Sequence, residues 1–156
     1  ISVQDAAGSV QAVQLQCCRT ENKMEFAELI QKAKEAREQA YAPYSGFHVG
    51  AALLCKDGTI FTGCNIENSA YGPTNCAERT AIFKAVSEGF REFEAIAIIS
   101  DSKQPTAPCG VCRQVMAEFC DPETFRIVLM NGDGEIRDYL LKELLPLGFT
   151  GKALEK

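Results

Sequence analysis

The sequence contains little of three things: long apolar runs, positive charge and histidine. No stretch approaches the roughly 20 apolar residues that span a bilayer, and residues 1–22 contain no apolar block of signal-peptide length. The 16 basic and 21 acidic residues leave a net charge of −5, which disfavours binding to the backbone of a nucleic acid. These absences predict an intracellular, cytoplasmic protein that binds small, soluble ligands and has neither a nucleic-acid nor a membrane partner.

Cysteine, by contrast, is plentiful, with eight residues in the chain. Two of them form a C-x-x-C pair, and a chain of 156 residues is large enough to fold without disulfide bonds. We therefore interpret the cysteines as reduced thiols, some of which bind a metal. With 46% hydrophobic residues, the chain is expected to form one domain that buries about 70% of its unfolded surface.

Two regions of the chain differ in composition. The first residues are rich in Gln, Ala and Ser and show no sustained periodicity, which is typical of a flexible arm. We therefore expect a flexible arm over residues 1–22 and a single folded domain over residues 23–156.

The pattern of apolar residues predicts alternating helices and strands after this arm. Helical spacing extends from Met24 to Tyr41, with Asn22 as the expected N-cap. The Asp57-Gly58 pair favours a tight turn, and hence a hairpin of the β-prone segments on either side. The predicted strands are 47–55, 59–66, 94–100, 125–130 and 136–140, and further helices are predicted at 77–89, 111–119 and around Leu144-Leu145. The order αββαβαββα indicates a layered α/β domain with a mixed sheet.

Three cysteines and one glutamate predict the chemistry. Cys76 and Glu78 lie two residues apart, and Cys109 follows 33 residues after Cys76. A β-α-β crossover over that spacing would place both cysteine motifs at helix starts on one edge of the sheet. A catalytic zinc takes three protein ligands and leaves a fourth position for water. We therefore predict one Zn²⁺ per chain, bound by Cys76, Cys109 and Cys112, with Glu78 as the proton carrier beside the water.

Arg79 directly follows the glutamate. Three thiolates on Zn²⁺ leave a formal charge of −1, which weakens the metal as a Lewis acid. Arg79 is the nearest cation, and by donating to a thiolate it would restore part of the power of the metal to acidify water. Zinc with a carboxylate that is not a ligand suits hydrolytic removal of an amino group from a heteroaromatic ring.

Four segments carry a resemblance to a known family: Cys76-Ala77-Glu78-Arg79, Pro108-Cys109-Gly110-Val111-Cys112-Arg113-Gln114, Gly63-Cys64-Asn65-Ile66-Glu67-Asn68 and Tyr44-Ser45-Gly46-Phe47-His48-Val49-Gly50-Ala51-Ala52. Through them the sequence resembles the small, homotetrameric, zinc-dependent cytidine deaminases over roughly Met24 to Phe149. The resemblance implies a three-layer α/β/α domain with a mixed sheet of about five strands. It also implies hydrolytic deamination of cytidine and 2′-deoxycytidine to the uridine nucleosides, with release of ammonia, in pyrimidine salvage.

The same resemblance implies a mechanism. Zinc-bound hydroxide would attack C4 of the base while Glu78 shuttles protons, and the backbone N–H of Ala77 would face the base.

The resemblance also assigns residues to substrate binding. Asn65 and Glu67 would hold the ribose hydroxyls, and Phe47 would pack on the pyrimidine. Tyr71 and Phe149 match family positions that act across subunit contacts. Each pocket of a homotetramer would then be completed by neighbouring subunits.

Several alternatives remain open from the sequence. A C-x-x-C pair at a helix start also occurs in thioredoxin-like redox proteins, but that reading leaves Cys76 and Glu78 without a role. A closed structural zinc site in an interaction domain would need a fourth ligand, for which Cys64, Cys55 and His48 are the candidates. A deaminase of a modified cytosine nucleoside is the nearest alternative, because the zinc motifs do not define the sugar.

Overall fold

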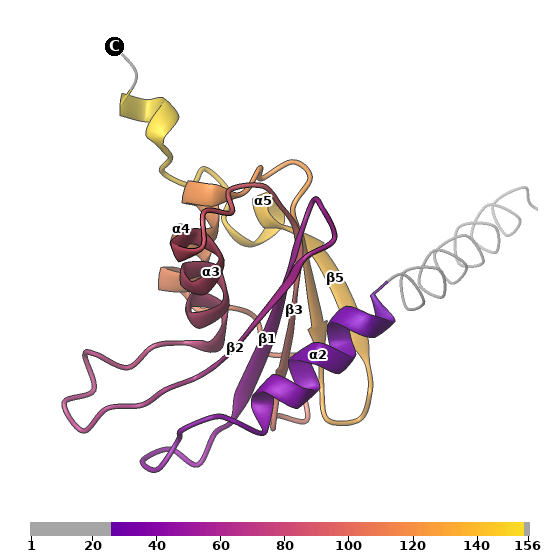
Figure 1. The fold of residues 1–156 in the computed structure, drawn as a ribbon, viewed down its shortest axis with the longest axis vertical. Coiled ribbons are helices and arrows are strands. Elements are labelled where there is room, and N and C mark those ends of the chain that lie inside the picture. The colour runs from indigo at the N-terminus through magenta and orange to yellow at the C-terminus, as the bar shows by residue number, and fades with distance from the viewer. Residues whose placement is uncertain (1–25, 155–156) are drawn as a thin grey trace, which may run out of the picture.

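A computed structural model describes residues 26–154 of the chain (Figure 1). The predicted arm over residues 1–22, its boundary with the domain and the expected N-cap Asn22 lie outside the described residues. Within the described part, no helix is long and apolar enough to cross a membrane.

A mixed sheet forms the centre of the fold. Its strands are β1 (Val49–Cys55), β2 (Ile60–Cys64), β3 (Phe93–Ser100), β4 (Arg126–Met130) and β5 (Ile136–Leu140). The spatial order is β2-β1-β3-β4-β5, in which only β3 and β4 are parallel neighbours. β1 and β2 form the predicted antiparallel hairpin, and Gly58 adopts a φ of +91° in its turn.

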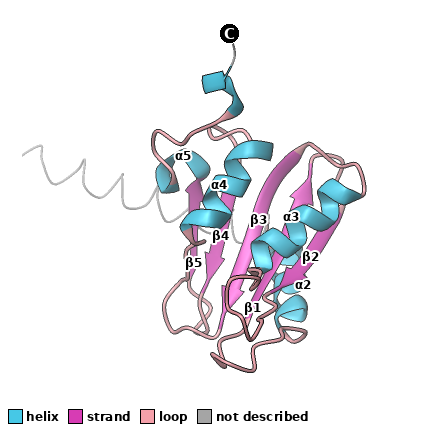
Figure 2. Cartoon of the chain, turned by 90° about the vertical axis from the view of Figure 1, so that its left-hand side faces the viewer, coloured by secondary structure: helices cyan, strands magenta, loops and turns pink. Residues whose placement is uncertain are grey.

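Helices cover both faces of the sheet (Figure 2). One face packs against α2 (Ala27–Arg37), and the other packs against α3 (Ala77–Ser87), α4 (Gly110–Phe119) and α5 (Leu141–Leu144). The result is the three-layer α/β/α arrangement that the resemblance implies.

The central strand β3 explains why the sequence shows no clean alternation of apolar and polar residues there. Ala95, Ala97 and Ile99 belong to the core under α2, whereas Ile96 and Ile98 belong to the core under α3 and α4. Because both faces of the strand are buried along this stretch, all five positions from Ala95 to Ile99 are apolar.

Two glycines allow helices to approach the sheet closely. A Cβ atom at Gly50 would lie 2.1 Å from the carbonyl oxygen of Ala33 in α2, and one at Gly63 would lie 2.4 Å from that of Ala77 in α3. Neither position therefore has room for a side chain. The absence of a side chain at Gly63 allows the first turn of α3, which contains the predicted catalytic residues, to pack directly on β2.

The strand directions bring two helix starts to one edge of the sheet. β1 is antiparallel to both β2 and β3, so β2 and β3 run in the same direction and end at the same edge. α3 follows β2 and α4 follows β3, so both helices begin beyond that edge, where open α/β sheets bind ligands. This is the arrangement that the spacing of the cysteine motifs predicts.

Some ends of the elements differ from the prediction. α2 ends at Arg37 rather than near Tyr41, because Tyr41 forms a bridge with Ile66 and its N–H donates to the carbonyl of Asn65 at 3.0 Å. Tertiary pairing thus ends the helix before its apolar pattern does. A short 3₁₀ helix at Gly151–Leu154 was not predicted.

Candidate active site

Three cysteine sulfurs cluster where α3 and α4 begin. The Sγ of Cys109 lies 3.9 Å from that of Cys76 and 3.5 Å from that of Cys112, and all three lie within 4.8 Å of one another. Sulfurs about 2.3 Å from one tetrahedral zinc ion would be separated by about 3.8 Å. The cluster therefore has the dimensions and donor chemistry of a zinc site. Within residues 26–154, no fourth His, Cys, Asp or Glu joins it.

Local backbone structure explains where the thiols lie. Cys76 and Cys109 are the N-cap residues of α3 and α4, with extended φ and ψ of −74° and 156°, and −65° and 165°. Neither N-cap makes a side-chain capping hydrogen bond. Both thiols lie at the positive end of a helix dipole, which favours the anionic thiolate. Cys112 lies in the first turn of α4 and is fully buried.

Arg79 lies beside this cluster. Its Nη2 donates to the Sγ of Cys76 at 3.3 Å and to the carbonyl oxygen of Thr74 at 3.4 Å. Its buried Nε has no hydrogen-bond partner among residues 26–154. A fixed cation with a spare donor next to three thiols fits the negative charge that three thiolates would place on zinc. The residues present therefore fit the metal.

The surroundings of Cys76 favour its thiolate. A hydrogen bond with Cys112, and after it the hydrogen bond and charge of Arg79, lower the pKa of Cys76 to about 5 in spite of its partial burial. The same hydrogen bond with Cys76, together with burial, raises the pKa of Cys112. A metal ion binds the deprotonated form of each thiol, so its arrival would release the remaining protons.

Glu78 lies in the first turn of α3 with only 4% of its surface exposed. Burial is the largest cause that raises the pKa of this carboxyl to about 7, and the negative charge of Cys76 acts in the same direction. A carboxyl with a pKa near neutrality both accepts and donates protons at working pH. The structure therefore places a buried carboxyl with a raised pKa beside the cysteines, and its role as the proton carrier stays a prediction.

Asn65 follows β2 and holds the start of β1. Its Nδ2 donates to the carbonyl oxygen of Phe47 at 2.8 Å, and its Oδ1 accepts the N–H of Val49 at 2.8 Å. The amide therefore orients the backbone on both sides of His48, including the residue predicted to pack on the base.

Glu67 lies on the same loop and points its carboxylate at a turn in the 41–46 segment. One oxygen accepts the N–H groups of Tyr44 at 2.8 Å and Ser45 at 3.2 Å, and the other accepts the hydroxyl of Ser45. These residues line a pocket of about 260 Å³ together with Tyr71 and Thr74. The structure thus brings Glu67 and Tyr71 together, as two walls of one pocket.

The predicted aromatic contacts are exposed to different degrees. Phe47 is 38% exposed, Tyr71 73% and Phe149 59%. Tyr71 packs edge-on against Tyr44 with ring centroids 6.1 Å apart. Phe149 belongs neither to the sulfur cluster nor to the pocket beside Glu67. It lies on the segment after α5, where its carbonyl oxygen accepts a hydrogen bond of 2.8 Å from Nε2 of Gln114 in α4.

Ala77 is fully buried as the first residue of α3.

The other candidate zinc ligands have different surroundings. The Sγ of Cys64 donates to the carbonyl oxygen of Gln39 at 3.3 Å, and Cys55 is buried within β1. Nδ1 of His48 lies 2.7 Å from a carboxylate oxygen of Asp101. The closed four-ligand site considered from the sequence is therefore not supported by the part of the chain that the structure describes.

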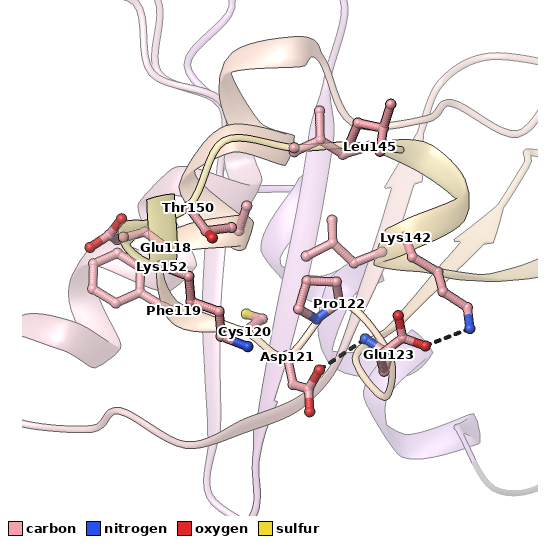
Figure 3. Close-up of a pocket in the computed structure, with 15 residues that line it drawn as sticks. Glu118, Phe119, Cys120, Asp121, Pro122, Glu123, Lys142, Leu145, Thr150 and Lys152 are labelled. Carbon is pink, nitrogen blue, oxygen red and sulfur yellow. Dashed lines mark hydrogen bonds and ion pairs between the residues drawn. The ribbon is translucent and has the colours of Figure 1, made fainter. Parts of the chain in front are cut away.

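A larger cavity, of about 700 Å³, lies at the opposite end of α4 (Figure 3). Its walls include the segment 117–123 and an ion pair of 2.6 Å between Lys142 and Glu123. The ten residues of α4 span about 15 Å, so this cavity is distant from the sulfur cluster. None of the predicted site residues lines it.

Ser45 is a residue of the pocket beside Glu67 that the sequence reasoning missed. Its hydroxyl contacts both Glu67 and the N–H of Phe47. The available signal was a serine two residues before Phe47, since serine hydroxyls commonly bond to backbone groups two residues ahead in turns.

Comparison with known proteins agrees with this geometry. Residues 24–128 match the profile of the cytidine and deoxycytidylate deaminase zinc-binding region. A cytidine deaminase of Sporosarcina psychrophila is 56% identical over 131 residues, which cover 84% of this chain and 96% of the relative. The crystal structure of cytidine deaminase from Burkholderia pseudomallei superposes with a TM-score of 0.76 at 54% identity, covering 79% of this chain and 98% of that one. A blasticidin-S deaminase of Bacillus cereus is 34% identical and covers 79% of this chain and 91% of its own.

The fold and the sulfur cluster define a zinc enzyme of the α/β/α type. The chain belongs to the cytidine and deoxycytidylate deaminase family, whose members are zinc-dependent deaminases. The predicted fold class, zinc cofactor and deaminase activity are thereby confirmed. The roles of individual residues stay predictions.

Proposed function

We propose that this protein hydrolyses cytidine and 2′-deoxycytidine to uridine and 2′-deoxyuridine with release of ammonia. The observation that carries the proposal is the buried carboxyl of Glu78, two residues after Cys76 and next to a cluster of three sulfurs. The names of relatives more than 50% identical support cytidine as the nucleoside.

Cys76, Cys109 and Cys112 would hold the zinc ion. When bound, zinc supplies an activated water by lowering its pKa towards 7. Glu78 takes a proton from the attacking water and gives it to N3 of the base; it then takes the remaining proton of the hydroxyl added at C4 and gives it to the departing amino group, which leaves as ammonia. Water adds to C4 and the C4–N bond breaks, so the atoms of cytidine and water are conserved in uridine and ammonia.

Substrate binding would use the loops beside this centre. Glu67 and Asn65 would bind the ribose hydroxyls, Phe47 would pack on the pyrimidine, and the backbone N–H of Ala77 would face the base. The pocket of about 260 Å³ beside Glu67 supports this binding mode, because it is open to solvent and the carboxylate of Glu67 lines it. Both carboxylate oxygens already accept hydrogen bonds, which holds them in one orientation.

The active form would be a homotetramer in the cytoplasm that serves pyrimidine salvage. Tyr71 and Phe149 are large aromatic residues with more than half of their surface exposed. Exposed aromatics of this kind are common in the centres of protein interfaces. In the assembly they would help to complete the pockets of neighbouring subunits.

A modified cytosine nucleoside is the second candidate substrate. The relative named blasticidin-S deaminase favours it, but at 34% identity against 56% for a relative named cytidine deaminase. Cytidine is therefore the primary proposal.

The test is the ultraviolet absorbance of cytidine incubated with the purified protein, before and after zinc chelation. Bound zinc is counted per chain in the same sample. We expect loss of the cytidine band, and this loss should depend on about one zinc per chain. Zinc without turnover of cytidine would contradict the proposed substrate, and turnover that survives complete removal of zinc would contradict the proposed chemistry.

A further inference from the structure

The hydroxyl of Ser45 joins two parts of the proposed nucleoside site. It donates its proton to Oε1 of Glu67 and accepts the backbone N–H of Phe47 at 3.0 Å. A single oxygen atom therefore contacts both the carboxylate proposed to hold the sugar and the backbone of the residue proposed to pack on the base.

The hydroxyl of Ser45 is one of three hydrogen-bond donors to the carboxylate of Glu67. The N–H groups of Tyr44 and Ser45 bond to the other carboxylate oxygen at 2.8 and 3.2 Å, so one turn satisfies both oxygens. Gly46, with a φ of +66°, follows directly and allows the chain to reverse towards Phe47. Glu67 is only partly buried, so these hydrogen bonds, more than packing, determine its orientation.

The hydroxyl also favours the ionised form of this carboxylate. Its hydrogen bond is the largest cause that lowers the pKa of Glu67. An ionised, oriented carboxylate is the form that accepts hydrogen bonds from two sugar hydroxyls.

We propose that Ser45 is a positioning residue for nucleoside binding, which orients the carboxylate of Glu67 and the backbone of Phe47 through one hydroxyl. This inference rests on the proposed function. It assigns a task to Ser45 that differs from direct contact with the substrate. Without the hydroxyl, the carboxylate keeps its two backbone donors but loses the third, and the N–H of Phe47 loses its acceptor.

Steady-state kinetics with cytidine test the proposal. We expect Ser45→Ala to raise KM about tenfold, the equivalent of one lost hydrogen bond to a charged group, while kcat changes less than twofold. Ser45→Thr retains a hydroxyl on the same exposed turn and should restore KM to within about threefold of wild type. The matched control is Ser87→Ala, which removes a hydroxyl that donates to a helix carbonyl, that of Lys84, and should leave KM unchanged.

A double-mutant cycle with Glu67→Gln separates positioning from direct contact. If Ser45 acts through Glu67, adding Ser45→Ala to Glu67→Gln should raise KM by much less than tenfold. The same tenfold rise in both backgrounds would overturn the proposal, as would a wild-type KM in Ser45→Ala. Thermal unfolding of each variant checks that the fold is retained.

The wild-type protein in the same assay distinguishes failure of the role proposed for Ser45 from failure of the proposed function. Turnover of cytidine by wild type with an unaltered KM in Ser45→Ala would remove only the role of Ser45. No turnover of cytidine by zinc-loaded wild type would overturn the proposed function, and this inference with it.

Discussion

Nη2 of Arg79 donates a hydrogen bond of 3.3 Å to Sγ of Cys76, one turn earlier in the same polypeptide segment. The guanidinium thus lies against a sulfur that caps α3, with a second anchor on the carbonyl of Thr74. This contact gives a physical basis for a catalytic zinc with three thiolate ligands, since donation to the sulfur withdraws negative charge from the metal.

Arg79→Gln should lower kcat for cytidine by about 10- to 100-fold, the range typical for groups that support metal ligands. The neutral amide cannot offset the charge of the thiolates. The control is Arg91→Gln, because Arg91 is an exposed arginine that bonds to the carbonyls of Val86 and Phe90, away from the sulfurs. Zinc content and kcat are measured together, and wild-type values for both in Arg79→Gln would refute this account.

Cys109→Ser should lose zinc, because a serine hydroxyl is a poor substitute for a thiolate. Cys64→Ser is the matched control, since Cys64 is partly exposed and bonds to the carbonyl of Gln39. Metal analysis of both purified variants should find about one zinc per chain in the control and a large deficit in Cys109→Ser. Full zinc occupancy in Cys109→Ser would remove this residue from the proposed ligand set.

Glu78→Gln should retain zinc while deamination falls by about 10²- to 10⁴-fold. The amide has a similar size but cannot take up or release a proton. Zinc content and turnover of cytidine are measured on the same preparation. Normal activity would reject Glu78 as the proton carrier.

Gly50→Ala should destabilise the fold by about 1–3 kcal/mol, because the new methyl group would lie 2.1 Å from the carbonyl oxygen of Ala33. α2 would have to move away from β1. Gly151→Ala is the control: a Cβ there meets no atom within 4 Å, so its effect should stay within about 0.5 kcal/mol. Urea unfolding of both variants provides the comparison, and equal stability would contradict the tight contact.

Asp101→Asn should destabilise the protein in a pH-dependent way. The carboxylate accepts the N–H of His48 at 2.9 Å, contacts its ring at 2.7 Å and lies 3.7 Å from Arg37. Partial burial opposes ionisation, but these hydrogen bonds and charges prevail and lower the pKa of Asp101 below its usual 3.8.

Because the folded-state pKa is lower than the unfolded one, this stabilisation is fully present above pH 3.8 and is lost as the pH falls through the folded-state value. The difference in stability between wild type and Asp101→Asn should therefore be full at pH 5 and shrink below pH 3.8. Chemical unfolding at a series of pH values measures it. If the stability difference between wild type and Asp101→Asn grew on acidification, folding would raise the pKa of Asp101 rather than lower it.

The sequence predicted most elements of the fold because their signals are local. Apolar spacing and the Asp57-Gly58 turn depend on a few neighbouring residues, and the β1-β2 hairpin forms as they indicate. The end of α2 was predicted too late, because Tyr41 is held by Asn65 and Ile66, which are distant in sequence. Contacts of that kind override helical propensity and leave no local pattern.

The chemical character of the site was already contained in the sequence: three thiols, one carboxyl and one guanidinium in two short motifs. Only the tertiary structure decided that sulfurs 33 residues apart lie 3.9 Å from each other, and that Glu78 is buried deeply enough to raise its pKa to about 7. It also revealed Ser45 between Glu67 and Phe47. The physical reason is that side-chain identity determines which reactions are available, whereas distance and desolvation, which determine whether groups interact, arise only when the chain packs.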